Sequence, residues 1–170
     1  MLYEHLVREN KEQFLQKVAL IASKLGIDPD WLMIVFKIES NVNHRAVNPI
    51  SGATGLIQFM PRTAAGLGTS TNALRGMSNV DQLDYVYKYY KRFAGRLNSV
   101  EDLYIVTFFP VALGKPDNYV LQTDTISAGK IASQNRLYDI NGDNKITLAE
   151  LKASILKKVP GEALAWIKKK

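Results

Sequence analysis

The residue with the strongest chemical signature in this sequence is a glutamate that follows a run of apolar residues. Glu39 comes directly after segment 31–38, in which Lys37 is the only charged residue. A carboxyl group between hydrophobic walls is poorly solvated, which raises its pKa and keeps it protonated near neutral pH. Such a group can act as a general acid. From this pattern alone, an ordinary carboxylate at a helix end explains Glu39 equally well.

The segment after Glu39 has the composition of a structured loop that lines a cleft. Residues 41–54 are rich in Asn, Pro, Ser and Gly, which predicts tight turns, with or without a small hairpin, before a short helix over 56–60. Gly52 and Gly55 would let the backbone approach a ligand closely, although simple turn chemistry also explains them.

The order of residues here resembles the family of soluble lytic transglycosylases and goose-type lysozymes, and especially its small phage-borne members. The resemblance covers residues from about 28 to 65 closely. It rests on the pair Glu39–Ser40, on the run Ala46-Val47-Asn48-Pro49 and on the run from Ser51 to Pro61, SGATGLIQFMP.

The resemblance implies a mainly α-helical, lysozyme-like fold and an enzyme that cleaves the β-1,4 bond between N-acetylmuramic acid and N-acetylglucosamine in bacterial peptidoglycan. It makes Glu39 the catalytic acid and, later in the reaction, the base. Gln58 matches the substrate-contacting glutamine of the family. We expect the substrate-binding residues to be Ser40, Ser51, Gly55, Leu56, Ile57, Gln58 and Tyr104.

The distribution of carboxylates bears on the reaction type. No Asp or Glu occurs between Ser40 and Val80, whereas most glycosidases need two carboxylates across the scissile bond. A distant Asp81, Asp84 or Glu101 that folds back is one alternative, and we favour the simpler single-carboxylate mechanism, assisted by the acetamido group of the substrate. The resemblance then favours a lytic transglycosylase that leaves 1,6-anhydro ends. A hydrolytic lysozyme stays open as the alternative.

The third motif of the family, usually Ala-Tyr-Asn-Ala-Gly, is poorly matched. Its counterpart lies within residues 107–114, and Tyr104 could supply the hydroxyl that the motif normally provides. A tyrosine at the start of a buried helix also commonly serves packing. The departure keeps a further alternative open, an inactive calcium-binding protein of a virion or of the wall.

Residues 139–150 match the twelve-position loop of an EF-hand. We expect calcium, as a structural cofactor, to be bound by Asp139, Asn141, Asp143, the Lys145 carbonyl, Thr147 and Glu150. Asn144 replaces the usual glycine, and Asn tolerates the left-handed backbone that this position needs. Segments 131–138 and 148–159 would flank the loop as helices. A turn without metal is the alternative.

Apolar spacing and capping residues predict the helices that position these groups. Residues 14–25 place apolar side chains three and four apart, up to a stop at Gly26. Asp28 as N-cap and Pro29 at the first helical position predict a helix over 31–40. The proposed acid then lies in the last turn of that helix.

Two further helices are expected after the loop. Ser78, with Asp81 three residues on, begins a long helix with one apolar face, formed by Leu83, Val86, Tyr90, Phe93 and Leu97. Asn98 or Ser99 caps a buried helix over 103–113. The long helix carries four tyrosines, Tyr85, Tyr87, Tyr89 and Tyr90. We expect them to fill or flank the core, and stacking on sugar rings is the alternative.

Bulk properties bound the remaining choices. The 170 residues carry a formal charge of +6 and no cysteine, so disulfides and thiolate metal sites are excluded. The charge suits an anionic partner, but no nucleic-acid-binding motif is present, and we rank that reading last. His5 and His44 lack metal-ligand spacing and are expected at the surface.

We expect a catalytic core over 1–122 and a packed appendage over 123–170, with neither a signal peptide nor a membrane span. These features and the resemblance suggest location in a phage virion or in the host cytoplasm, with action on the cell wall. Virion components would be further partners.

Overall fold

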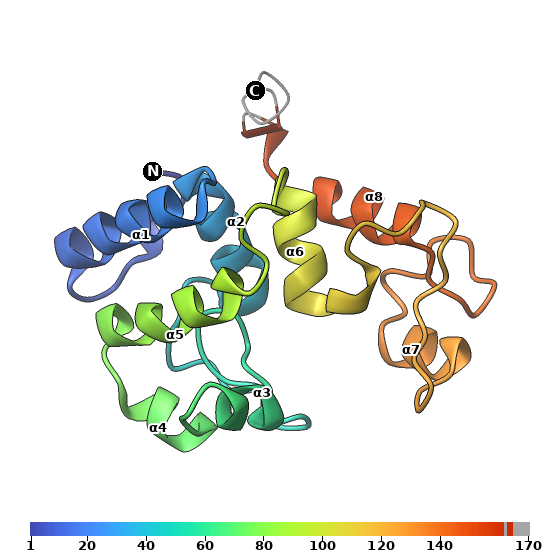
Figure 1. The fold of residues 1–170 in the computed structure, drawn as a ribbon, viewed down its shortest axis with the longest axis horizontal. Helices are drawn as coiled ribbons and strands as arrows, with labels where there is room; N and C mark the ends of the chain where they lie inside the picture. Colours follow the sequence, from blue (N-terminus) through green and yellow to red (C-terminus); the bar gives the residue numbers. More distant parts are fainter. Residues whose placement is uncertain (162, 165–170) are drawn as a thin grey trace. The chain divides into compact units, whose positions relative to one another are not determined.

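The computed structural model describes residues 1–161, 163 and 164 and is mainly helical, as the sequence predicts (Figure 1). The chain divides into two compact units, unit 1 over Met1–Val100 and unit 2 over Glu101–Lys170. This division precedes the boundary expected near residue 122, because side chains at 104 and 108 pack with Tyr138 of the C-terminal part.

Unit 1 contains six helical segments among its residues, all of which the structure describes. They are η1 (Glu4–Leu6), α1 (Lys11–Leu25), α2 (Pro29–Ser40), α3 (Pro61–Gly66), α4 (Thr71–Gly76) and α5 (Asn79–Lys91). The two capping predictions for α1 and α2 are confirmed. Gly26 ends α1 with a left-handed φ of 70°, and the Asp28 side chain caps α2 by accepting from Asp30 N–H.

The core of unit 1 forms where α1 packs against α2 and α5. Phe14 of α1 and Phe36 of α2 are buried, and their ring centroids lie 6.2 Å apart. A salt bridge of 2.9 Å joins Lys17 of α1 to Asp84 of α5 at the edge of this packing. The three helices thus form the support on which the loop after α2 is built.

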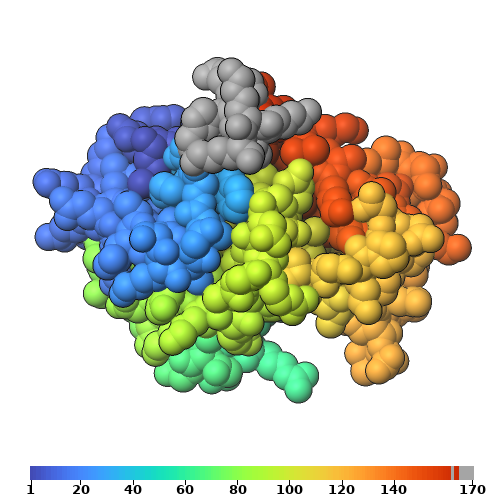
Figure 2. Space-filling view, turned by 45° about the horizontal axis from the view of Figure 1, so that its top comes forward, coloured from blue at the N-terminus to red at the C-terminus, as the bar shows by residue number. Residues whose placement is uncertain are grey.

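The loop between α2 and α3 forms turns rather than strands. Its elements are two isolated antiparallel bridges, Val47 with Thr54 and Thr54 with Phe59, and no strand is assigned in residues 1–161, 163 and 164. In Figure 2 the teal segment that contains this loop projects from the surface of unit 1. The loop prediction is therefore confirmed without a regular hairpin.

The short helix expected over 56–60 does not form. Gly55 and Gln58 both have a left-handed backbone, with φ of 86° and 51°, which no right-handed helix accommodates. Thr54 and Phe59 instead exchange backbone hydrogen bonds of 3.0 and 2.8 Å across the turn. We call residues 54–59 the closed turn.

Helix α5 begins as expected, since Ser78 accepts a hydrogen bond from Asp81 N–H. It ends at Lys91, however, and not near residue 97. Gly95 has a left-handed φ of 78°, so the apolar positions 93 and 97 lie beyond the helix. The helical spacing of apolar residues therefore continues in the sequence beyond Lys91, where the helix itself ends.

Helices α6 (Val100–Phe108), α7 (Ala128–Gln134) and α8 (Leu148–Lys158) and the 3-10 turn η2 (Pro110–Ala112) follow in the chain. The expected helix over 103–113 is thus interrupted before Pro110, which cannot continue the helical hydrogen-bond ladder. Backbone bonds of 2.9 Å join Leu121 to Ile146 and Leu148 to Tyr119. Within the described residues, no helix has the length and apolar character needed to span a membrane.

Candidate active site

Glu39 is the penultimate residue of α2 and is partly exposed, whereas residues 32–36 of the same helix are buried. The chain turns sharply just after it. Asn41 and Val42 both have left-handed φ values, 55° and 59°, and Val42 N–H donates to Phe36 C=O at 3.0 Å. This end of α2 brings the Glu39 carboxyl to the edge of the apolar core.

Tyr89 of α5 lies in the electrostatic neighbourhood of Glu39. Its side chain is 6% exposed and packs edge-on against Phe59, with ring centroids 6.4 Å apart. Burial raises the pKa of Tyr89 to about 12; the Arg92 guanidinium acts in the opposite direction, and the charge of Glu39 adds to the rise. Tyr89 is therefore a neutral phenol near pH 7.

The buried side chain of Gln82 holds the closed turn in place. Its Oε1 accepts from Leu56 N–H at 2.7 Å, and its Nε2 donates to the carbonyls of His44 and Leu74 at 2.9 and 3.0 Å. Gln82 is 0% exposed, so these bonds are shielded from water. One side chain of α5 thus joins the loop after α2, helix α4 and the closed turn.

Gly55 is a glycine for a reason that this arrangement makes plain. A Cβ atom at position 55 would lie 2.4 Å from Gln82 Oε1, and φ is 86°. Both the space and the backbone conformation exclude a side chain. Close approach of backbone to a ligand is not needed to explain this residue.

Ser40 and Gln58 add two more tethers around the closed turn. Ser40 is buried, and its hydroxyl lies 3.0 Å from the carbonyls of both Phe36 and Leu56. Gln58 is partly exposed, and its Nε2 donates to the carbonyls of Gly55 and Ala46 at 3.1 and 3.3 Å. The end of α2 and the closed turn are therefore joined directly.

A model of the transglycosylase SLT domain family matches residues 18–100. Residues 18–100 form a domain of this family. The matched segment lies wholly within unit 1 and contains Glu39, the closed turn and Gln82. The protein is therefore an enzyme of the lytic transglycosylase type, a glycosidase of lysozyme-like fold that acts on peptidoglycan. No solved structure matches the chain.

Within the SLT domain, the residues expected to bind substrate differ in exposure. Leu56 and Ile57 are 0% and 4% exposed, so their side chains belong to the core. Ser51 is exposed on the loop, where its hydroxyl accepts from Ala53 N–H at 3.3 Å. Gln58, partly exposed, is the polar member of the closed turn. The substrate roles assigned to these residues stay predictions.

Tyr104 lies on α6, in unit 2. It is 2% exposed, and its hydroxyl lies 2.5 Å from that of Tyr138, to which Lys158 Nζ donates at 2.9 Å. The ring of Phe108 stacks on Tyr104 at 6.3 Å. This buried aromatic cluster gives Tyr104 a packing role within unit 2, and its substrate role stays a prediction.

Sequence reasoning missed two residues of the SLT domain and misplaced a third. Gln82 was not singled out, although a polar residue on the same helix face as Val86 and Tyr89 signals a buried hydrogen-bonding group. Tyr89 was treated only as one of four tyrosines. His44 was expected at the surface and is 6% exposed; the expectation was wrong because Gln82 draws this loop inward through the His44 carbonyl.

The loop over 139–150 has the backbone that the sequence predicts at its sixth position, where Asn144 has a φ of 63°. The Asp139 carboxylate accepts from the amides of Gly142 and Asp143 on one oxygen and from that of Asn144 on the other. Asn141 and Asp143 accept in the same way from amides two residues on. These bonds organise the loop from within.

The donor set of this loop fits calcium in part. All its side-chain ligands are oxygens, which calcium prefers. The Glu150 carboxylate, however, already accepts from Ile140, Asn141 and twice from Thr147, which uses about four acceptor sites. In the part of the chain that the structure describes, no three Asp, Glu or His side chains are arranged to hold a metal ion.

Proposed function

We propose that the protein is a lytic transglycosylase in which Glu39 is first the acid and then the base. Glu39 donates its proton to the glycosidic oxygen, and the bond from that oxygen to C1 of the muramic acid breaks. The 6-hydroxyl of the same sugar forms a bond to C1 and returns its proton to Glu39. No water is consumed, and the product carries a 1,6-anhydro end.

The other carboxylates of unit 1 support a single-carboxylate reaction, because each is held by a structural partner. Their hydrogen-bond or ion-pair partners are Met1 and Lys11 for Glu4, Arg45 for Glu9, Gln16 for Glu12, Asp30 N–H for Asp28, Leu2 N–H for Asp30, Ser78 for Asp81 and Lys17 for Asp84. None of these partners belongs to the closed turn. Glu39 lies next to Ser40, whose hydroxyl donates to the Leu56 carbonyl of that turn.

Tyr89 is the group that we assign to the support of Glu39. Its hydroxyl keeps its proton at working pH, because its pKa is about 12. A neutral phenol near a carboxyl group can stabilise the carboxylate without competing for its proton. Since Tyr89 packs on Phe59, α5 would set the position of this hydroxyl relative to the closed turn.

Product analysis of purified peptidoglycan tests the proposal. We expect the wild-type protein to release muropeptides with 1,6-anhydro ends. Each should be about 18 Da lighter than the hydrolytic product, because it lacks one water molecule. Glu39→Gln should lower the rate by at least about a thousandfold. Glu12→Gln, an exposed glutamate on α1, is the matched control. Reducing ends would establish a hydrolase instead, and wild-type cleavage by Glu39→Gln would refute the role of Glu39.

We also propose a phage-type setting for the enzyme, with virion components as partners. The support is the resemblance of residues 39–61 to small phage-borne members of the family. Mass spectrometry of purified virions from the source tests this setting. Recovery of the chain at a fixed copy number per particle would support it, and its absence from particles would exclude a virion role.

A structural calcium ion in the loop over 139–150 is a further proposal. The oxygen-only donor set, the EF-hand spacing and the left-handed Asn144 support it. Calcium should raise the melting temperature, by an amount corresponding to about 2.7 kcal/mol at a hundredfold excess over Kd. Asp139→Ala should remove this increment, whereas Asp124→Asn, an exposed Asp outside the loop, should keep it. A wild-type melting temperature that calcium leaves unchanged would refute the proposal.

A further inference from the structure

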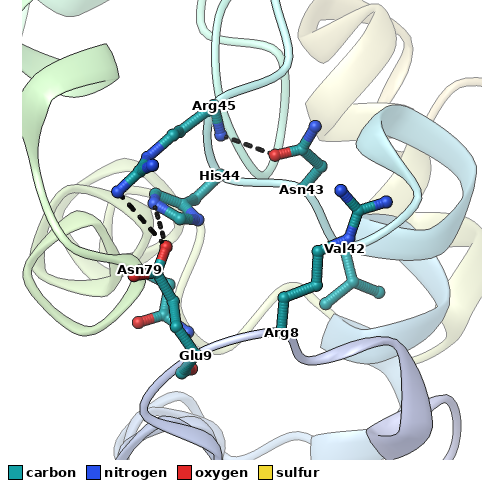
Figure 3. A pocket seen from close by; sticks show the side chains of 7 residues that line it. All are labelled: Arg8, Glu9, Val42, Asn43, His44, Arg45 and Asn79. Atoms are coloured by element: carbon teal, nitrogen blue, oxygen red, sulfur yellow. Dashed lines mark hydrogen bonds and ion pairs between the residues drawn. The ribbon is translucent and has the colours of Figure 1, made fainter.

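A pocket of about 110 Å³ lies in unit 1, between the segment before α1 and the loop after α2 (Figure 3). Its lining residues are Arg8, Glu9, Val42, Asn43, His44, Arg45 and Asn79. A pocket of this size has room for a small polar group such as a carboxylate.

The lining of the pocket is polar and carries an excess of positive charge. Arg8 and Arg45 contribute two guanidinium groups, against the single carboxylate of Glu9. Glu9 Oε1 lies 3.1 Å from His44 Nε2 and 3.4 Å from an Arg45 nitrogen, and Figure 3 shows these contacts converging on one oxygen. One positive charge stays uncompensated, so the pocket favours one further anionic group.

His44 adds an unsatisfied donor or acceptor to this lining. The residue is 6% exposed, and its Nε2 atom has no hydrogen-bond partner, although Glu9 Oε1 lies 3.1 Å away. A buried polar atom without a partner costs free energy that a ligand can recover. Burial lowers the pKa of His44, with Glu9 acting in the opposite direction and Arg45 in the same one.

The pocket adjoins the proposed catalytic loop through the backbone. Its residues 42–45 begin three positions after Glu39, and the next residue, Ala46, accepts from Gly55 N–H at 2.8 Å and from Gln58 Nε2 at 3.3 Å. The His44 carbonyl is held by Gln82. A ligand in the pocket would therefore contact the same loop that carries the closed turn.

We propose that this pocket is a subsite for a carboxylate of the peptide stem that peptidoglycan strands carry, which rests on the proposed function. The stem has free carboxylates and is attached to the sugar whose bond is cleaved. Arg8 and Arg45 attract the carboxylate from opposite sides of the pocket (Figure 3), and His44 and the Asn43 amide complete its hydrogen bonds. The subsite selects peptide-bearing strands over bare glycan.

The test uses the full chain carrying Glu39→Gln and a soluble stem tetrapeptide with free carboxylates. Nuclear magnetic resonance of the Arg8 and Arg45 side chains and of the His44 ring should show saturable shifts. A peptide with amidated carboxylates should bind at least about tenfold more weakly, as should a Glu39→Gln protein that also carries Arg8→Gln and Arg45→Gln. Arg62→Gln, an exposed arginine on α3 outside the pocket, is the matched control.

Three results would overturn the subsite: no shift at these residues, equal binding of free and amidated peptides, or equal binding of acetate and peptide, which would indicate an adventitious ion only. Cleavage of peptide-bearing and bare glycan is measured in parallel. Wild-type cleavage with no peptide binding refutes the subsite alone, whereas peptide binding together with wild-type cleavage by Glu39→Gln refutes the proposed function alone.

Discussion

The closed turn of unit 1 and the loop over 139–150 of unit 2 both contain left-handed residues, but different interactions stabilise them. Each contains a left-handed glycine and a left-handed polar residue, Gly55 and Gln58 in the first, Gly142 and Asn144 in the second. The turn of the second is held by side chains within its own twelve residues, and its Ile146 end is also bonded to Leu121. The first depends on Gln82 and Ser40, which lie 26 and 16 residues from Leu56.

This difference separates a locally encoded loop from one that the tertiary structure imposes. Asp139 and Asn141 organise the amides that follow them wherever the segment lies, as such side chains commonly do in turns. The closed turn would lose its support if α5 moved, since Leu56 N–H is bonded to Gln82. The proposed catalytic residues therefore lie next to the less autonomous of the two loops.

Removal of the Gln82 amide should have the largest effect, because it destabilises the closed turn and not the loop over 139–150. Gln82→Met keeps the side-chain volume but leaves Leu56 N–H and the His44 and Leu74 carbonyls buried without this partner. We expect a loss of about 4 kcal/mol in the free energy of unfolding of unit 1, together with loss of cleavage. Urea unfolding and hydrogen exchange of the Leu56 amide measure it.

The control for this change is Gln13→Met, at an exposed position on α1, which should stay within about 0.5 kcal/mol of wild type. Hydrogen exchange in the 139–150 loop should be unaffected by Gln82→Met if that loop is autonomous. Equal loosening of both loops would contradict the distinction drawn between them.

A matched pair of glycine substitutions, one in each loop, should have effects of intermediate size. Gly55→Ala would place a Cβ 2.4 Å from Gln82 Oε1, whereas Gly142→Ala, with a similar φ of 74°, meets nothing within 4 Å. We expect the left-handed backbone to lower the free energy of unfolding by about 1 to 2 kcal/mol at either site. At Gly55 the displacement of Gln82 should lower it by about 2 kcal/mol more. Thermal unfolding of both variants tests this, and equal losses would show that the contact with Gln82 carries no cost.

The smallest expected effect is a pH dependence confined to unit 1, since the two histidines of the chain are His5 and His44. Burial lowers the pKa of His44 below 6.5, so the unfolded chain binds the proton more readily. Stability should therefore be fully present above about pH 6.5 and should fall as the pH drops through 6.5 toward the lowered folded pKa.

Melting temperatures between about pH 5.0 and 7.5 measure this dependence, in the range where histidine titrates. His44→Gln should flatten the profile, and His5→Gln, at an exposed position, should leave it unchanged. A wild-type profile that rises on acidification in this range would show that Glu9 outweighs burial.

The sequence by itself determined the features that neighbouring residues encode. Asp28 and Pro29 start α2, Gly26 ends α1, and Asn144 takes the left-handed conformation that its loop position needs. The order of residues from Glu39 to Pro61 indicated the family, and the match over 18–100 confirms it. In each case the deciding interaction spans a few residues, so that it can be read from spacing.

Only the tertiary structure decided how the SLT domain supports its site. Gln82 fixes the closed turn, Tyr89 lies near Glu39, and His44 is buried, although none of these facts follows from the local pattern. The helix expected over 56–60 failed for the same reason, because the bond from Leu56 to α5 replaces the helical ladder. Buried polar groups must find partners wherever the fold brings them, and a linear sequence does not state where that is.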